Sequence, residues 1–413
     1  MERRDVIVIG GGIAGLSFAW HATRAGQRTL VLEATPRAGG CLDSRSVGAG
    51  SAAYWYELGA HTCYNSYQAL LEIADATGLS ALIRPRGEAR KRFALLRDGR
   101  LTTMGPLSVF RQFSWWQLAG SLLRALFSRK RPGLSTRAHF SRLVGADNYQ
   151  RVLAPFLSAV PSQAVDDFPA SGAGSLFKRR TRRKDIIKTF SFDGGLGSVV
   201  DKLAGLVETR TGAAVSALRP QADSDGGGGG GGYRVELADG QSFAARAVAL
   251  AVGPAAATRL LAPAFPALAA PLGRIATVDV DSVGVVVPRA AVALPELAFI
   301  VPAADIFWSA VTRDPLPDPT RRAFAFHFRP GHSQDERLAC ITRVLGVATD
   351  ALEVVHTRST TLPSPTVGHD AVVAELDRGL AGTRLALTGN YFAGLAIEDC
   401  VARSKAEWTR IAR

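Results

Sequence analysis

The sequence predicts an α/β protein, and two observations carry this prediction. Val6-Ile7-Val8-Ile9 is an apolar run typical of a buried parallel strand, and a glycine turn, a helical pattern and a second strand at residues 29–32 follow it. This unit is complete within about 30 residues, which is its usual length. After a run of seven glycines at residues 226–232, alanine-rich and β-branched segments alternate up to Val367. At roughly 100–200 residues per domain, the 413 residues predict two or three compact units.

The turn at residues 10–15 has the pattern G-x-G-x-x-G, between the first strand and the first helix. Gly10 allows the tight turn, Gly12 lets backbone N–H groups approach a pyrophosphate, and Gly15 lets the helix pack closely on the strand. The N–H groups at the helix start belong to Ile13 and Ala14. Together these features predict a dinucleotide site and leave NAD and FAD open.

Glu33 ends the second strand, 18 residues after Gly15. This position lets its carboxylate accept a hydrogen bond from a ribose 2′-hydroxyl. An acid here also disfavours a 2′-phosphate, because the two charges would repel each other.

The residues after Glu33 decide between the two cofactors. Residues 34–40 read Ala-Thr-Pro-Arg-Ala-Gly-Gly and resemble the second fingerprint of the flavin amine oxidase superfamily. The resemblance implies non-covalent FAD, with this segment lying along it: Ala34, Arg37, Gly39 and Gly40. A guanidinium neutralises phosphate charge, and two glycines let the backbone pass close to the dinucleotide.

The C-terminal region narrows the resemblance. Gly389-Asn390-Tyr391, Gly394 and Asp399-Cys400 are similar to the terminal motif of the protoporphyrinogen oxidases, where many amine oxidases have an acid in place of Asn390. The resemblance implies that the helix starting near Ala396 and Ile397 points its N-terminus at the flavin. Its dipole would stabilise negative charge near N1 and C2=O.

The middle of the chain resembles the same family more diffusely. Residues 362–369 match its proline-containing segment that ends in Gly-His, and residues 154–160 match its Pro-Phe motif. Residues 192–196, Val215 and residues 249–254 fit its middle FAD elements, which implies that the backbone of Val215 lies beside the adenine and that Gly253 also contacts the cofactor.

This resemblance implies a Rossmann-type, glutathione reductase-like FAD domain that is discontinuous, together with an α+β substrate domain. We expect the FAD domain at residues 1–80, 191–260 and 369–413, a helical substrate or membrane-association region at 81–190, and the substrate-domain sheet at 261–368.

Two segments depart from the family pattern. A Gly-Pro-Ser-like turn is replaced by Glu57–Asn65, and residues 160–163 replace a glycine-acid segment. The first turn should lie near the flavin, which makes Gly59, Ala60 and His61 candidate cofactor contacts. His61 is also the candidate catalytic residue, because histidine accepts protons near neutral pH. The alternative is a hydrogen-bonded structural histidine.

The implied function is the oxidation of a porphyrinogen to a porphyrin in haem biosynthesis, with dioxygen reoxidising the flavin. Two alternatives stay open: another oxidase or desaturase of the superfamily acting on an amine or a polyisoprenoid, and an FAD-binding protein without turnover. Protoporphyrinogen and coproporphyrinogen are not distinguished, and the oligomeric state is not predicted. The histidines show no ligand spacing, so no metal site is expected.

The net charge of +13 is concentrated in two segments. Residues 84–131 hold twelve basic residues against two acidic ones, and residues 178–188 hold seven against one. Residues 107–131 also carry Trp115 and Trp116, which predicts either an interfacial helix on an anionic membrane or an ordinary core helix with a basic end.

The basic run 178–184 has no interleaved aromatic residue, so we expect a mobile solvated loop and no nucleic-acid site. Seven glycines at 226–232 predict a disordered hairpin tip between two strands. Four scattered cysteines favour a reducing compartment. Because the first strand starts so early, no signal peptide is expected, and no apolar run reaches the ~18 residues of a spanning helix. A cytoplasmic protein, with peripheral binding to the inner membrane face left open, fits these features.

Overall fold

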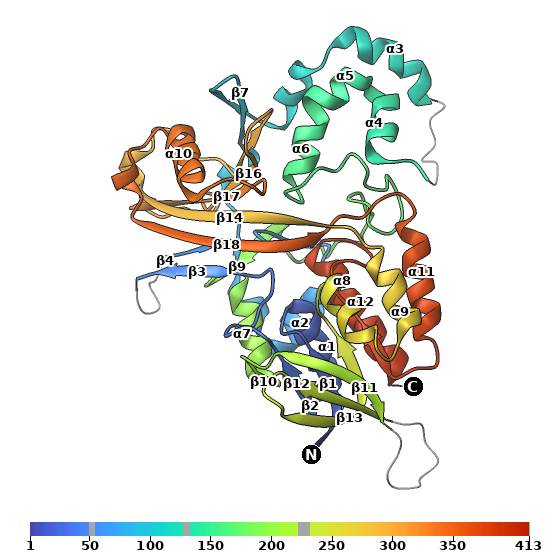
Figure 1. Cartoon of the computed structure of the whole chain (residues 1–413). Coiled ribbons are helices and arrows are strands. Elements are labelled where there is room, and N and C mark those ends of the chain that lie inside the picture. The colour runs from blue at the N-terminus through green and yellow to red at the C-terminus, as the bar shows by residue number, and fades with distance from the viewer. Residues whose placement is uncertain (49–53, 127–132, 222–231, 413) are drawn as a thin grey trace.

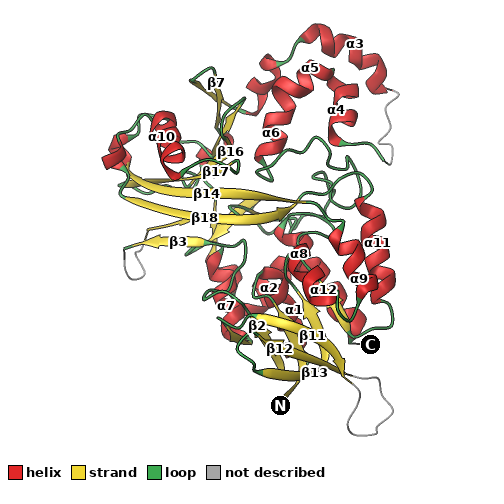
Figure 2. Ribbon diagram, in the orientation of Figure 1, coloured by secondary structure: helices red, strands yellow, loops and turns green. Residues whose placement is uncertain are grey.

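The computed structural model describes residues 1–48, 54–126, 133–221 and 232–412. The chain has a mixed α/β fold with two large sheets, and helices cover both of them (Figure 2). In Figure 1 the sheet that contains both the first strand and the last one lies at the bottom, the long strands of the second sheet cross above it, and a group of helices lies at the top.

Five strands of the lower sheet run parallel in the order β10, β2, β1, β13, β19. They are β10 (Glu208–Arg210), β2 (Thr29–Leu32), β1 (Glu2–Ile9), β13 (Ser242–Leu250) and β19 (Leu385–Leu387). Alternate residues of β1 enter different cores, with Val6 and Val8 on one face and Ile7 and Ile9 on the other. Burial on both faces explains why this strand is apolar throughout.

Helices cover both faces of this sheet. One face carries α1 (Ile13–Arg24), α2 (Gln68–Thr77), α7 (Gly197–Leu206) and α12 (Ile397–Ile411). The other face carries α8 (Pro254–Leu261), α9 (Pro266–Gly273) and α11 (His369–Leu380). Helix α9 comes from the segment expected to form the substrate domain, yet its Leu268 and Leu272 pack into the core of the lower sheet.

The glycine tract lies between two paired strands. β11 (Val215–Gln221) and β12 (Gly232–Leu237) are antiparallel, and β12 also pairs with β13. Residues 222–231 are outside the described residues, so the expected tip is not described. Gly232 itself is part of β12, where a Cβ atom would lie 2.7 Å from the Ala245 carbonyl oxygen, so the expectation that all seven glycines form the tip is wrong.

The second large sheet has the order β18, β14, β17, β16, β15, β7, β8. Its strands are β18 (Val354–Pro363), β14 (Thr277–Pro288), β17 (Arg321–Phe328), β16 (Phe307–Thr312), β15 (Phe299–Pro302), β7 (Phe93–Arg97) and β8 (Arg100–Met104). β7 and β8 come from the region expected to be helical. They extend the sheet because β7 pairs with β15, where Phe93 stacks on Phe299 with ring centroids 5.2 Å apart.

The aromatic and basic stretch is not one helix. After β8 it forms the short 3₁₀ helix η3 (Pro106–Gln112) and then α3 (Trp115–Leu126), which packs against α4 (Thr136–Val144). The side chains of Trp115 and Trp116 are 63% and 91% exposed, so the alternative of an ordinary core helix is wrong for both tryptophans. The basic residues 129–131 are outside the described residues. No described helix has the length and apolar character needed to cross a bilayer.

Candidate cofactor and substrate site

Three predicted cofactor segments meet at the carboxyl edge of the parallel strands. The N–H of Gly10 donates to the Leu32 carbonyl (2.8 Å), and the N–H of Ala251 donates to the Ile9 carbonyl (2.7 Å). The N–H of Thr388 donates to the carbonyl of Leu250 (3.0 Å). The glycine turn, Gly253 and the Gly389-Asn390 segment therefore follow neighbouring strands at one edge, which is where such sheets bind ligands.

The three motif glycines of the turn have different surroundings. Gly10 has φ +106°, and a Cβ there would lie 2.6 Å from the Ala251 carbonyl oxygen. A Cβ on Gly15 would collide with the Gly10 carbonyl. At Gly12, by contrast, the nearest atom would be the Gly40 Cα at 3.7 Å, which is an ordinary contact. The fold requires Gly10 and Gly15, whereas Gly12 borders open space.

The start of α1 is available to an anion. Gly12 is its N-cap, no side chain caps the helix, and its first turn contains no acidic residue. The first N–H groups of a helix have no intrahelical partners, so those of Ile13 and Ala14 can donate to a phosphate. This geometry fits the pyrophosphate of a dinucleotide.

Glu33 holds the glycine turn through hydrogen bonds to its carboxylate. Its carboxylate accepts hydrogen bonds from the N–H of Gly11 (2.7 Å) and from the N–H of Thr35 (2.9 Å). The N–H of Ala213 donates to the Glu33 carbonyl (2.8 Å), which brings the chain just before Val215 beside Glu33. The structure thus brings Glu33 and the start of β11 together.

The Arg37–Gly40 segment lies against the glycine turn. The N–H of Gly39 donates to the Gly11 carbonyl (2.8 Å). Arg37 donates to the Leu42 carbonyl (3.0 Å) and lies 3.5 Å from the buried Asp43 carboxylate. The guanidinium of Arg37 thus folds back onto its own loop in this structure.

Sequence reasoning missed Arg358, which reaches this loop from β18 of the other sheet. It donates to the Gly40 carbonyl (2.6 Å) and to Asp43 (2.9 Å). Asp43 also pairs with Arg45 at 2.8 Å. No spacing in the sequence could have revealed a contact between residues more than 300 positions apart.

The C-terminal motif forms a second helix start beside the first. Ala396 is the N-cap of α12, and no side chain caps this helix. The Ser404 hydroxyl donates to the Ala14 carbonyl (2.7 Å) and so joins α12 to α1. His369, the end of the Gly-His segment, is hydrogen-bonded to the Tyr391 carbonyl at 2.7 Å.

Two residues of the basic run, Lys178 and Arg180, are anchored to this motif, so the expectation of a mobile solvated loop is wrong for these two. Lys178 lies 2.9 Å from the Asp399 carboxylate, and Arg180 lies 2.8 Å from the same oxygen. Gly394 has to be small, because a Cβ there would lie 2.7 Å from Asp399 Oδ2. The ion pairs of Lys178 and Arg180 with Asp399 therefore hold the basic run against the first turn of α12.

The predicted His61 turn passes next to the same loop. The N–H of Ala60 donates to the Cys41 carbonyl (3.0 Å), and a Cβ on Gly59 would collide with that carbonyl. His61 Nε2 is hydrogen-bonded to His327 Nε2 at 2.9 Å, and His327 Nδ1 to Ser282 Oγ at 2.8 Å. The turn therefore links the loop after β2, at Cys41, to the second sheet, at His327 of β17.

Both rings of this pair are uncharged near neutral pH. Burial holds the pKa of His61 well below 6.5 and lowers the pKa of His327 to about 4. The hydrogen bond fits the structural-histidine alternative, although His61 also lines a pocket. Among the described residues, no group of three His, Cys, Asp or Glu side chains could hold a metal ion.

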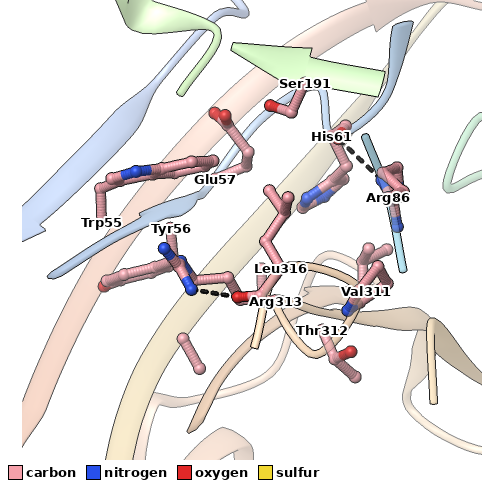
Figure 3. A pocket seen from close by; sticks show the side chains of 13 residues that line it. Trp55, Tyr56, Glu57, His61, Arg86, Ser191, Val311, Thr312, Arg313 and Leu316 are labelled. Carbon is pink, nitrogen blue, oxygen red and sulfur yellow. Dashed lines mark hydrogen bonds between the residues drawn. The ribbon is translucent and has the colours of Figure 1, made fainter. Parts of the chain in front are cut away.

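This pocket lies between β4 (Tyr54–Glu57), β9 (Thr189–Phe192) and the strands β16 and β17 (Figure 3). Its polar lining includes Glu57, His61, Arg86, Ser191 and Arg313. Glu57 accepts hydrogen bonds from the N–H of Leu196 (2.7 Å) and from Ser44 (2.7 Å), yet burial raises its pKa to about 7. Sequence reasoning did not identify Arg86 or Arg313.

Residues 13–402, nearly the whole chain, match the family of flavin containing amine oxidoreductases. The chain belongs to this family. FAD is its cofactor, and the protein is an FAD-dependent oxidoreductase. Three features of the site fit this dinucleotide. The starts of α1 and α12 have no side-chain cap, the backbone at Gly12 leaves room for a phosphate, and the Glu33 carboxylate lies beside the glycine turn.

Three known proteins resemble this chain over nearly its full length. Coproporphyrinogen III oxidase of Propionibacterium freudenreichii subsp. freudenreichii is 23% identical, and the match covers 97% of this chain and 89% of that protein. A protein of Exiguobacterium sp. 255-15, provisionally described as a protoporphyrinogen oxidase, has a similar structure with a TM-score of 0.78, 21% identity and coverage of 99% and 98%. Cyclohexylamine oxidase of Brevibacterium oxydans IH-35A gives a TM-score of 0.69, 16% identity and coverage of 99% and 100%.

Proposed function

We propose that this flavoenzyme oxidises a porphyrinogen to a porphyrin in haem biosynthesis and uses dioxygen as its electron acceptor. One observation carries the proposal: coproporphyrinogen III oxidase matches 97% of this chain and 89% of its own length. The terminal Asn390 supports the same substrate class, because many amine oxidases have an acid there. Cyclohexylamine oxidase shares the fold, but a likeness at 16% identity gives no information on the substrate of this chain.

We further propose that FAD is bound without a covalent link, by the residues that surround the parallel edge. Gly12, Ile13 and Ala14 would hold the pyrophosphate, Glu33 the ribose, and the backbone of Val215 the adenine. The α12 start at Ala396 and Ile397 would face the isoalloxazine ring and stabilise negative charge there through its free N–H groups. The other proposed contacts are Gly10, Gly15, Ala34, Arg37, Gly39, Gly40, Gly59, Ala60, His61, Gly253, Gly389, Asn390 and Gly394.

The protein's own part in the reaction is binding and orientation. Bound FAD supplies the oxidant. The pocket at Glu57 and Arg86 orients a substituent of the substrate, while the apolar residues Val311 and Leu316 on its wall exclude water. Because His61 and His327 are neutral, His61 can hold a proton at its ring without placing a charge in the site.

A substrate panel under air tests the proposal. Coproporphyrinogen III, protoporphyrinogen IX, putrescine and cyclohexylamine are each incubated with the holoenzyme, and porphyrin fluorescence and peroxide are followed. We expect porphyrin and peroxide with a porphyrinogen. Peroxide from an amine alone would favour the amine oxidase alternative, and no turnover of any substrate would favour an FAD-binding protein.

A further inference from the structure

Two arginines of the pocket have no acidic partner. Arg86 is only 8% exposed, and its guanidinium donates to the His61 carbonyl (3.0 Å) and to the Thr62 hydroxyl. Arg313 donates to the Leu316 carbonyl and lies over the rings of Tyr54 and Trp55, at 4.6 and 4.7 Å. Within the described part of the chain, neither guanidinium is ion-paired with a carboxylate.

A buried cation without a counter-charge is costly, and this cost is removed when an anion binds. Other charged groups in this chain show the contrast: buried Arg322 pairs with Asp314. In Figure 3 the guanidinium groups of Arg86 and Arg313 stand on either side of the pocket, with Leu316 drawn between them. The two positive charges thus face a shared space.

Further polar atoms without a hydrogen-bond partner among the described residues belong to side chains that line the same pocket. Ser191 Oγ is buried and has no hydrogen-bond partner among the described residues, and the same is true of Arg313 Nε. Glu57 is the only carboxyl group in the described lining, and two hydrogen bonds to Leu196 and Ser44 already engage it. The pocket therefore offers donors and positive charge to whatever enters it.

We propose that Arg86 and Arg313 form an anion subsite that binds a carboxylate-bearing substituent of the substrate and rejects a cationic amine. This inference rests on the proposed function and adds the residues that select the substrate. Guanidinium groups bind carboxylates through paired N–H donors, and an ammonium group between two of them would be repelled.

The test compares three small probes of nearly equal shape: 3-phenylpropionate, 3-phenylpropanamide and 3-phenylpropylamine. Binding to the FAD-loaded protein is measured by calorimetry. We expect the carboxylate to bind at least tenfold more tightly than the amide, and the amine to bind most weakly. Arg86→Gln should abolish the preference for the carboxylate over the amide, whereas Arg86→Lys should retain part of it.

Arg84→Gln is the matched control. Arg84 lies two positions away, is exposed and pairs with Asp193 at 2.6 Å, so this variant removes the same charge outside the pocket and should bind the probes as wild type does. FAD content and thermal unfolding confirm that each variant is folded. Should Arg86→Gln fail to fold, Arg313→Gln takes its place with the same expectation.

Equal binding of the carboxylate and the amide to the wild type would overturn the subsite, and so would tightest binding of the amine. Turnover separates this result from the proposed function. Porphyrin formation without any carboxylate preference would refute the subsite alone. Carboxylate preference without porphyrin formation would refute the proposed substrate and leave the subsite in place.

Discussion

His61 and His327 come from different parts of the fold and meet with their Nε2 atoms 2.9 Å apart. Because both rings are neutral, one nitrogen donates and the other accepts, and His327 Nδ1 continues the chain to Ser282 at 2.8 Å. Protonation of one ring would place a charge in this buried pair, and protonation of both rings would break the hydrogen bond, since two N–H donors would then face each other.

This relationship predicts how stability changes with pH. Burial lowers the pKa of His327 from 6.5 to about 4 in the folded protein. As the pH falls from 6.5 towards 4, the unfolded chain binds a proton that the folded protein does not, so the free energy of unfolding decreases over this range. A shift of this size corresponds to up to about 3 kcal/mol. Urea unfolding of the wild type between pH 4 and 7.5 should show this loss, and His327→Gln should flatten it.

His332→Gln serves as the control, because His332 lies just before α10 (Gln334–Leu345) with its Nδ1 atom 3.9 Å from the Glu336 carboxylate, and the buried pair is formed by His61 and His327. This variant should keep the loss of stability that the wild type shows between pH 6.5 and pH 4. The same slope in His327→Gln and in the wild type would contradict the assignment of this loss to the buried pair.

The glycine turn yields a second prediction. Gly12→Val places a side chain where the fold leaves room, so FAD should be lost almost completely while the protein stays folded. Gly15→Val creates a collision with the Gly10 carbonyl and should destabilise the fold itself. Flavin absorbance and circular dichroism of the purified variants separate the two effects. A Gly12→Val protein with full flavin content would refute the proposed pyrophosphate site.

A third prediction concerns Glu33. Glu33→Ala removes the proposed ribose contact and the hydrogen bonds to Gly11 and Thr35. We expect FAD binding to weaken by about 1–3 kcal/mol, which is roughly a 5- to 150-fold higher Kd. Fluorescence titration of the apoprotein with FAD measures this change. Thr35→Val, which keeps the carboxylate, should cost less, and an unchanged affinity in Glu33→Ala would count against the ribose contact.

The exposed tryptophans lead to a fourth prediction, that α3 binds an anionic membrane surface. Trp115 and Trp116 are 63% and 91% exposed, and Leu107 and Phe110 nearby are also exposed. Basic residues near an anionic bilayer contribute about 1 kcal/mol each, and the run 129–131 follows α3. Wild type should co-sediment with anionic liposomes at low salt, and less at high salt.

The Trp115→Ser/Trp116→Ser variant should stay in the supernatant while keeping FAD. Leu206→Ser removes an exposed apolar side chain from α7 instead and should sediment like the wild type. Wild type that remains in the supernatant at low salt would show that these tryptophans serve some other purpose.

The N-terminal half of the FAD region was predictable because its signals are local. The apolar run at residues 6–9, the glycine spacing and Glu33 all lie within one strand–helix–strand unit, and β1, α1 and β2 form at those positions. The residue types in this unit are determined by the local backbone conformation and by residues nearby in the sequence. They can therefore be interpreted without knowledge of contacts to distant parts of the chain.

The pocket was not predictable, because its parts come together only through long-range pairing. Arg86 and Arg313 lie on loops far apart in the sequence, and each looks like an ordinary surface charge until the sheets assemble. Phe93 is another example, since it joins the second sheet only through β15, about 200 residues later. Side-chain periodicity contains no information on such pairs.

The most direct test of the central claim is reduction of the bound flavin without oxygen. Holoenzyme is mixed anaerobically with coproporphyrinogen III, protoporphyrinogen IX or cyclohexylamine, and the flavin absorbance band is followed before air is admitted. The proposed function predicts bleaching with a porphyrinogen, and then recovery of the band and porphyrin fluorescence under air. A band that bleaches with cyclohexylamine and stays unchanged with both porphyrinogens would contradict it.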